Sequence, residues 1–219
     1  GNYMERCVGL SASSYVFAMF SNTFSNVVGC IAVGRQGGGR PATYVPQSVQ
    51  NTVFSYTDSF SDDYETLEDL QGVKTNWVGN TYADPRFVNA AALDFHLLSA
   101  AGNISNGVWV TNAAVGYSPA IDFGNRLEGV GAEPNPNGGR INVGLYGGTA
   151  DASKSRSDPW LFAISFNDGG TLLQTGRLEW VASTNFGAGS QVDLQYSTNR
   201  GTNWSAIARV NATNETYAW

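Results

Sequence analysis

Four short stretches in the middle of the chain decide the fold: YADPRFVN (residues 82–89), LDFHL (93–97), SPAIDFG (118–124) and NGGRINVGLYG (137–147). Pro85 and Pro119 fix φ and lack an N–H, which suits turns and edges better than central strands. Gly138 and Gly139 permit a positive φ directly before the last run, and Asp122 can hydrogen-bond nearby backbone in an Asx turn. The stretches therefore predict short extended segments separated by tight turns.

In this order, the four stretches resemble the C-terminal end of right-handed parallel β-helix proteins of the pectate-lyase-like superfamily. In that superfamily, segments of the form ADPxFV, DFHL, SPAIDxG and GGRxNxGxYG follow one another over the last coils. The resemblance covers roughly residues 80–150. It implies a fold and not a chemistry, because these segments end and cap the helix in proteins of many activities. Catalytic groups of the family usually lie on middle coils, which this chain is expected to lack.

The rest of the chain is also rich in strand-like runs and poor in helical periodicity. Short β-rich runs recur at residues 5–10, 15–20, 27–33, 52–57, 108–111, 141–146, 160–166, 178–182, 192–196 and 206–210. Clusters of Gly, Asn, Ser and Pro separate them, and the one candidate helical turn, at 64–70, is too short to organise a domain. Many short strands with frequent turn signals predict an all-β fold.

A weak repeat in the N-terminal part fits the β-helix. Cys7 and Cys30 lie 23 residues apart, and Phe54 follows after another 24. One coil of a parallel β-helix spans about this length, and equivalent residues of successive coils stack on one another. We expect residues 1–100 to form successive coils, with these three residues in one inward stack and both thiols free and buried. The alternative is a chance spacing, because two cysteines define a single interval.

Composition excludes several classes of protein. The chain has 219 residues, 14% of them charged, and a formal net charge of −6. This acidic balance argues against nucleic-acid binding, which needs a basic face. No apolar run approaches the roughly 20 residues of a membrane helix, and an aromatic content of 12% argues against intrinsic disorder. We expect the chain to be a fragment of a longer protein.

A second domain is expected at the C-terminus. The polar stretch DASKSRSDP (151–159) is typical of a linker. Beyond it, STNRGTNW (197–204) resembles the Asp-box hairpin of sialidases and of bacterial fibronectin-III-like or immunoglobulin-like modules, with Asn199 in place of the Asp. That resemblance gives Asn199 and Gly201 the role of closing the turn, and it packs Trp204 beneath them.

The predicted domains are therefore parallel β-helix coils with a C-terminal cap at 1–157, and a truncated β-sandwich at 158–219. Five strand candidates lie in the second domain, at 160–166, 178–182, 192–196, 204–210 and 215–219. A complete sandwich needs about seven. An incomplete one leaves an open edge, which we expect to be hidden against the β-helix or against another copy of the chain.

Candidate catalytic and metal-binding groups are few. His96 is the single histidine, and without a nucleophile motif we interpret it as structural. The acidic stretch 58–69 holds Asp58, Asp62 and Asp63, whose oxygens are of the kind that calcium prefers. The competing interpretation is a solvated acidic loop. No catalytic residue is assigned, and no cofactor is predicted other than this calcium ion.

Exposed aromatic residues would serve a sugar-binding surface. Trp77, Trp109 and Tyr117 lie in Asn- and Gly-rich stretches and are the candidates, with buried packing as the alternative. Trp180 and Trp204 are expected in the sandwich core.

The sequence favours an extracellular or cell-surface structural or adhesive protein of bacterial type, without a catalytic site of its own. The alternative is the non-catalytic end of a polysaccharide-binding or polysaccharide-degrading enzyme, either a lyase or a glycoside hydrolase. Expected partners are polysaccharides, other surface proteins or a second copy of the chain.

Overall fold

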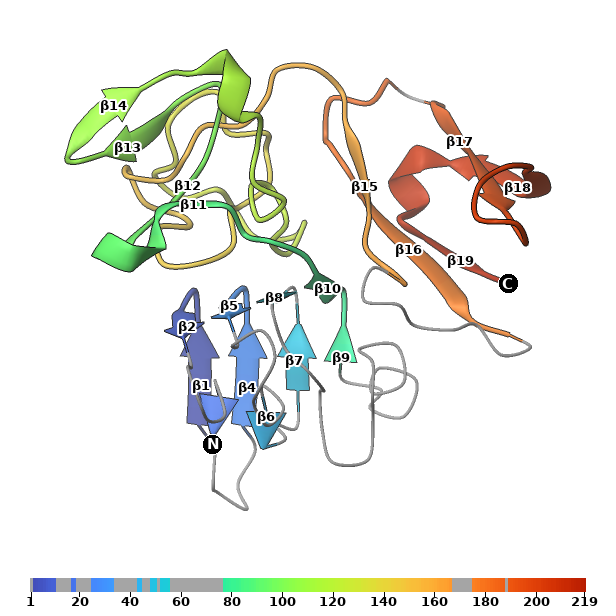
Figure 1. Cartoon of the computed structure of the whole chain (residues 1–219), viewed down its shortest axis with the longest axis horizontal. Coiled ribbons are helices and arrows are strands. Elements are labelled where there is room, and N and C mark those ends of the chain that lie inside the picture. Colours follow the sequence, from blue (N-terminus) through green and yellow to red (C-terminus); the bar gives the residue numbers. More distant parts are fainter. Residues whose placement is uncertain are drawn as a thin grey trace.

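The fold is all-β. The computed structural model describes residues 2–10, 17–18, 25–33, 43–44, 48–50, 52–55, 77–166, 175–187 and 189–219. These residues form short strands grouped in small sheets, and their only helices are three single turns of 3-10 helix (Figure 1). None of the helices in these segments is long and apolar enough to cross a membrane.

Two four-stranded parallel sheets make up the N-terminal part. The first contains, in spatial order, β1 (Asn2–Glu5), β4 (Ser25–Val28), β7 (Ser48–Gln50) and β9 (Trp77–Val78). The second contains β2 (Val8–Leu10), β5 (Ile31–Val33), β8 (Val53–Ser55) and β10 (Thr81–Tyr82). A further parallel pair joins β3 (Phe17–Ala18) to β6 (Thr43–Tyr44).

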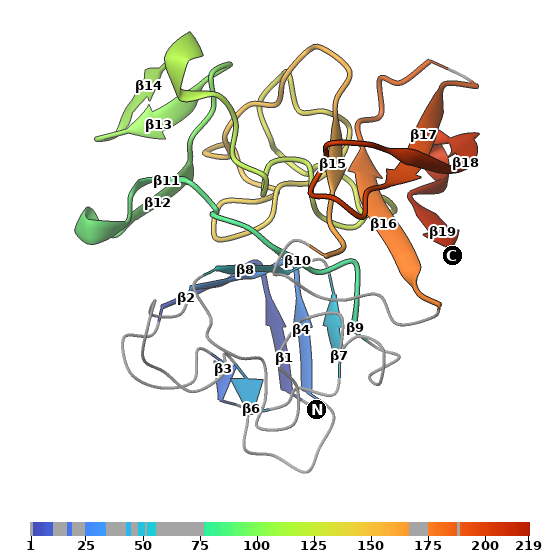
Figure 2. The same cartoon turned by 45° about the vertical axis from the view of Figure 1, so that its right-hand side comes forward.

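The chain passes from the first sheet to the second four times, each time through a short bend (Figures 1 and 2). Val8 pairs with Ile31, Ile31 with Val53, and Val53 with Thr81, so the steps are 23, 22 and 28 residues. The variation in these steps lies in the connections, because the strands themselves keep their register.

The bends carry a ladder of polar contacts. The Cys7 N–H donates to Cys30 Sγ at 3.3 Å, and the Thr52 N–H donates to Asn80 Oδ1 at 3.0 Å. Cys7 and Cys30 are therefore equivalent, as their spacing predicts. The expected third member of the stack is wrong: Phe54 pairs with Ala32, and Thr52 takes the position after Cys30, because the second step is 22 residues and not 24.

Both cysteines are free thiols, as expected, but only Cys30 is fully buried. Cys7 is half-buried, and its Sγ donates to Glu5 O at 3.2 Å. Burial raises the pKa of Cys30 to about 12, so its thiol stays protonated in the folded protein.

Parallel pairing ends at Tyr82 in the described part of the chain, so the expectation of coils continuing to residue 100 is wrong. Two antiparallel hairpins follow instead: β11 (Phe87–Asn89) with β12 (Asp94–Leu97), and β13 (Asn103–Ser105) with β14 (Val108–Val110). Single 3-10 turns, η1 (Ala90–Ala92) and η2 (Ala113–Val115), complete this region.

Residues 118–157 form no strands and lie over the end of the second parallel sheet, as Figures 1 and 2 show. Phe123 and Val143 from this segment share a buried cluster with Ile31 and Val53 of the sheet. Gly144 allows this segment to lie close to the parallel sheets, and its N–H donates to Gly29 O at 2.9 Å. A Cβ at Gly144 would lie 2.8 Å from Ile31 Cδ1, so only glycine fits without a shift.

In the described C-terminal residues, 161–166, 175–187 and 189–219, there are five strands, where five were predicted, with shifted ends. They are β15 (Leu161–Ala163), β16 (Arg177–Ala182), β17 (Gln191–Tyr196), β18 (Ser205–Asn211) and β19 (Thr216–Ala218). A three-stranded sheet has the order β15-β16-β19, and β17 pairs with β18. A small apolar cluster centred on Trp180 lies between them, joined by Val192 and Val210 of the β17–β18 pair.

The two tryptophans expected in this core behave differently. Trp180 is 3% exposed and donates its Nε1–H to Ala212 O at 2.7 Å, so its predicted burial is confirmed. Trp204 is 59% exposed, so its prediction is wrong. Its ring lies beside Gly201, at the end of a turn that Asn199 closes by accepting the Asn203 N–H at 2.9 Å.

The middle of the stretch expected as a linker is buried, whereas its two ends are exposed. Ser153 and Ser155 are 3% and 0% exposed. The Ser153 hydroxyl donates to Leu97 O at 2.6 Å, and the Ser155 N–H donates to Pro136 O at 2.8 Å. The Ser155 hydroxyl donates to Asp122 Oδ1 at 2.6 Å. Both serines thus bond to groups far away in the sequence, so this part of the stretch belongs to the core.

The C-terminal strands consequently pack directly on the rest of the molecule. Ile164 and Val181 belong to the same buried cluster as Ile31. Arg140, 4% exposed, donates to Glu215 Oε1 at 2.8 Å, and this carboxylate also accepts the Ala182 N–H at 3.0 Å. Buried contacts of this kind fix the position of the C-terminal sheets.

Candidate ligand-binding cavity

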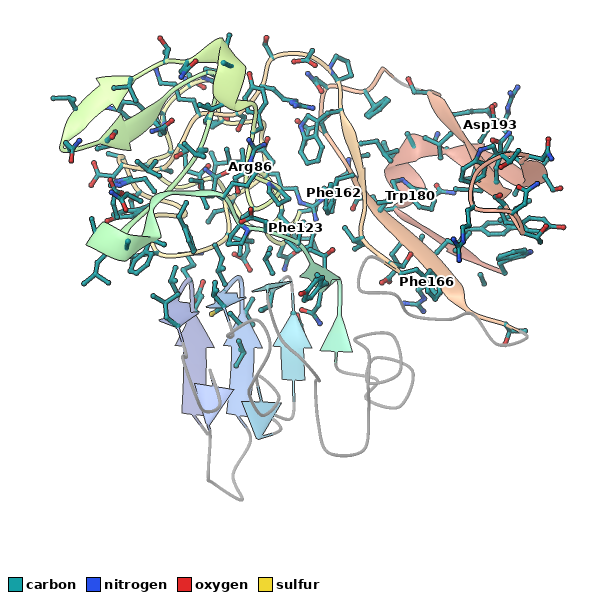
Figure 3. The ribbon with its side chains drawn as sticks, viewed as in Figure 1. Arg86, Phe123, Phe162, Phe166, Trp180 and Asp193 are labelled. Atoms are coloured by element: carbon teal, nitrogen blue, oxygen red, sulfur yellow. The ribbon has the colours of Figure 1, made fainter. Side chains whose placement is uncertain are left out.

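A cavity of about 330 Å³ opens where the C-terminal strands meet the middle of the chain. Two groups of residues line it: Ala83, Asp84, Arg86, Tyr117, Ser118, Pro119, Ile121 and Asp122 on the one hand, and Arg156, Trp160, Leu161 and Phe162 on the other. Figure 3 labels Arg86 and Phe162, one residue from each group. Mostly apolar cavities of this size with a few charged groups are typical of small-ligand sites.

Aromatic rings and one guanidinium form the characteristic part of the lining. Tyr117, Trp160 and Phe162 all line the cavity. The Arg156 Cζ lies 4.4 Å from the centroid of the Tyr117 ring and 6.0 Å from that of the Trp160 ring. Among the described residues, Arg156 makes no hydrogen bond or ion pair. Its charge therefore lies against aromatic faces, and the nearest electrostatic effect on a carboxyl is the one it exerts on Asp122, without an ion pair between them.

Arg86 has a different role. Its two Nη groups donate to Tyr117 O, at 3.1 Å, and to Val115 O, and its own N–H is bonded to Asp84 Oδ1 at 2.8 Å. These contacts use the guanidinium to fix the backbone that carries Tyr117. Arg86 is thus a positioning residue of the cavity wall.

Asp122 lies at the buried end of the lining and is 1% exposed. Its Oδ1 accepts the Ser155 hydroxyl at 2.6 Å, and its N–H donates to Asn142 Oδ1 at 2.9 Å. Its Oδ2 is buried and has no hydrogen-bond partner among the described residues; it lies close to Gly138, where a Cβ would be 2.3 Å away. Burial raises the pKa of Asp122 to about 7, against the opposing effect of the Ser155 hydrogen bond.

Glu133 is a second buried carboxyl, outside the cavity lining. Its Oε1 accepts the N–H groups of Asn142 and Gly148, both at 2.8 Å, while Oε2 has no hydrogen-bond partner within the described part of the chain. Burial raises the pKa of Glu133 to about 7 as well. Asn142 bonds to both acidic residues, through its side chain to Asp122 and through its N–H to Glu133. The NGGRINVGLYG stretch therefore builds a buried polar network beneath the cavity.

Of the two sugar-binding candidates whose side chains the structure describes, Tyr117 lines the cavity and Trp109 does not. Trp109 lies on the exposed hairpin strand β14, is 45% exposed and has Lys154 Nζ 5.1 Å from its ring centroid. Trp77 belongs to β9, and its side chain lies outside the described part of the structure. Trp109 is therefore not part of the cavity, and Trp160 and Phe162 line it together with Tyr117.

His96 stands apart from the cavity. Its Nδ1 lies 2.6 Å from Asp94 Oδ1, and its ring stacks on Tyr146 with centroids 3.8 Å apart and planes 6° apart. No serine hydroxyl is hydrogen-bonded to it among the described residues. The contacts join strand β12 to the 141–147 loop, which agrees with a structural histidine.

The expected calcium ligands Asp58, Asp62 and Asp63 lie outside the described residues. Within the described ranges, no cluster of three or more His, Cys, Asp or Glu side chains could hold a metal ion.

Comparison with known proteins adds no assignment: no family model, curated protein or solved structure matches this chain.

Proposed function

We propose that the chain is the C-terminal end of a right-handed parallel β-helix protein of the pectate-lyase-like superfamily, followed by a small β-sandwich. Two parallel sheets, visited alternately over four turns of the chain, support the helix. The strandless segment 118–157, which covers one end of these turns, supports the cap. A five-stranded arrangement around Trp180 supports the sandwich.

The proposed function is binding of an extracellular polysaccharide, within a structural or adhesive protein at the cell surface. The cavity lined by Tyr117, Trp160 and Phe162 carries this proposal. Aromatic faces pack against the apolar C–H faces of sugar rings, and a nearby charged group fixes orientation. Buried contacts on both sides of the cavity hold these side chains in place before a ligand arrives, which reduces the entropic cost of binding.

A degradative role is the second candidate, and one observation favours it. Asp84 and Asp122 both line the cavity, and a carboxyl with a pKa of about 7 has the acidity that a general acid needs. Against this, Asp122 is engaged by Ser155 and Asp84 by the Arg86 N–H. We therefore place binding first.

The test is a titration of the full chain with a panel of plant, algal and bacterial polysaccharides, followed by calorimetry or tryptophan fluorescence. Trp160→Ala is expected to weaken binding at least tenfold, because it removes one aromatic wall. Trp204→Ala removes an exposed tryptophan that does not line the cavity, and it is the matched control. Thermal unfolding of both variants checks that the fold is retained. Equal loss in the two variants, or no binding to any glycan, would contradict the proposal.

A further inference from the structure

We propose that the cavity selects a sugar ring bearing an acidic substituent, a carboxylate or a sulfate ester, and that Arg156 is the residue that pairs with it. This inference rests on the proposed glycan-binding function and adds the chemical class of the ligand.

The first argument is that Arg156 differs in its contacts from six of the seven other arginines that the structure describes; the seventh, Arg200, is exposed at a hairpin turn. Each of the following pairs with a carboxylate: Arg6, Arg126, Arg140, Arg177 and Arg209. Arg86 donates to two backbone carbonyl groups. Arg156 lines a cavity and has only ring contacts among the described residues. A cation half-buried against aromatic rings, with no ion-paired carboxylate among the described residues, is suited to pair with an anionic group of a ligand.

The second argument concerns geometry. A guanidinium stacked on an aromatic ring uses its flat face for that contact and keeps its in-plane N–H donors for other partners. Those donors match the two oxygens of a carboxylate or the oxygens of a sulfate. The Tyr117 ring, 4.4 Å from Arg156 Cζ, lies next to this donor set. A pyranose packed on the aromatic wall would place a substituent at its C6 within reach of the guanidinium.

The third argument concerns charge. The charged groups of the lining are Arg86, Arg156, Asp84 and Asp122. Asp84 is exposed at the surface, and Asp122 already accepts the Ser155 hydroxyl. Because burial raises the pKa of Asp122 to about 7, this carboxyl is largely uncharged in mildly acidic solution. The lining then carries a net positive charge although the whole chain is acidic.

The experiment compares trisaccharides that share one β-1,4-glucan backbone and differ only at C6. Cellotriose is the neutral probe, a glucuronic acid trimer carries carboxylates, its methyl ester restores neutrality, and 6-O-sulfated cellotriose carries sulfates. Binding is measured by calorimetry on the full chain at pH 6. We expect at least one acidic trimer to bind ten- to a hundredfold more tightly than the neutral probes, in line with a hydrogen bond to a charged group. The arms with carboxylate and sulfate identify which anion is preferred.

Arg156→Gln is expected to remove this preference while leaving weak binding of the neutral trimers. Arg156→Lys keeps the charge without the fork of donors, and it should retain only part of the preference. Arg200→Gln, at an exposed hairpin turn away from the cavity, is the matched control and should bind as the unaltered chain does. If Arg156→Gln fails to fold, the lysine variant and the effect of added salt decide.

The outcomes separate this inference from the proposed function. Equal affinity for neutral and acidic trimers, or an unchanged preference in Arg156→Gln, would overturn the role of Arg156 and leave glycan binding standing. Absence of binding to every trimer and to the polysaccharide panel would overturn both.

Discussion

Replacing the buried carboxyl of Asp122 by an amide is expected to flatten the dependence of stability on pH. The ordinary pKa of an aspartate is 3.8, and burial raises that of Asp122 to about 7, so the folded chain binds this proton more tightly than the unfolded chain. The resulting stabilisation is fully present below about pH 4 and is lost as the pH rises through 7. Each pKa unit is worth 1.36 kcal/mol, which gives a loss of about 4 kcal/mol for this group.

Several groups act on this carboxyl. The Ser155 hydroxyl, Arg140 and Arg156 favour the charged form, while Glu133 disfavours it, and burial outweighs the three favourable contacts. Glu133 itself loses stabilisation over a similar pH range, because burial raises its pKa from 4.5 to about 7. The unaltered chain should therefore lose several kcal/mol of unfolding free energy between pH 5 and pH 8.

The assay is urea unfolding of the full chain at pH 5, 6, 7 and 8. Asp122→Asn keeps an oxygen that can accept from Ser155, and it should reduce the pH slope by up to about half because Glu133 still titrates. Asp193→Asn is the control: Asp193 is exposed, its pKa is lowered by Arg209, and the substitution should leave the slope unchanged in this window. A stability that is flat or rises from pH 5 to pH 8, or a slope unaffected by Asp122→Asn, would refute the reasoning.

Two further predictions concern stability, and a third concerns catalysis. Gly138→Ala is expected to destabilise the chain by about 2 kcal/mol or more, because φ is +61° and the new Cβ would meet the Asp122 carboxylate. The control is Gly107→Ala, at φ +76° in open space, which should lower the free energy of unfolding in urea by about 1 kcal/mol. Trp180→Phe should lower the free energy of unfolding by about 2 kcal/mol, since it replaces a buried indole by a smaller ring and leaves the Ala212 carbonyl group without the indole donor. Trp204→Phe, at an exposed position, should change it by less than about 0.5 kcal/mol. The isolated chain should release no reducing ends or unsaturated products from pectin, alginate or related polymers, and steady turnover by pure protein would contradict this.

The strands of this chain were predictable from local pattern to a large extent. Each of the five C-terminal strands in the described residues overlaps a run predicted from the sequence. In β17 apolar and polar residues alternate, because one face of this strand packs on a small core. The register between Cys7 and Cys30 followed from their spacing. The next register did not, because the connections differ in length and only strand pairing shows that Thr52, and not Phe54, follows Cys30.

The burial of particular polar residues could not be predicted from the sequence. The stretch with Ser153 and Ser155 has the composition of a linker, yet its hydroxyls bond to Leu97 O and Asp122 Oδ1. Such partners lie dozens of residues away, so no local signal marks them. The opposite error occurred at Trp204, whose size suggested burial although its hairpin leaves the ring mostly in solvent.

The candidate site was predictable only in part. Tyr117 was selected from its surroundings in sequence, but the cavity needs Arg156, Trp160 and Phe162 from a segment that the linker interpretation and the expected second domain had placed apart. A run that combines an arginine with two aromatic residues within seven positions is a usable signal in retrospect. That this run lies next to Tyr117 depends on the tertiary packing of β15, so it could not be predicted from the sequence.

The most direct measurement is a crystal structure of the full chain with the tightest-binding trisaccharide from the series. We predict one sugar ring packed against Tyr117 and Trp160, with its acidic group within about 3 Å of the Arg156 nitrogen atoms. A ligand bound elsewhere, for example on the exposed face of Trp109, or an empty cavity at saturating ligand concentration, would contradict the account.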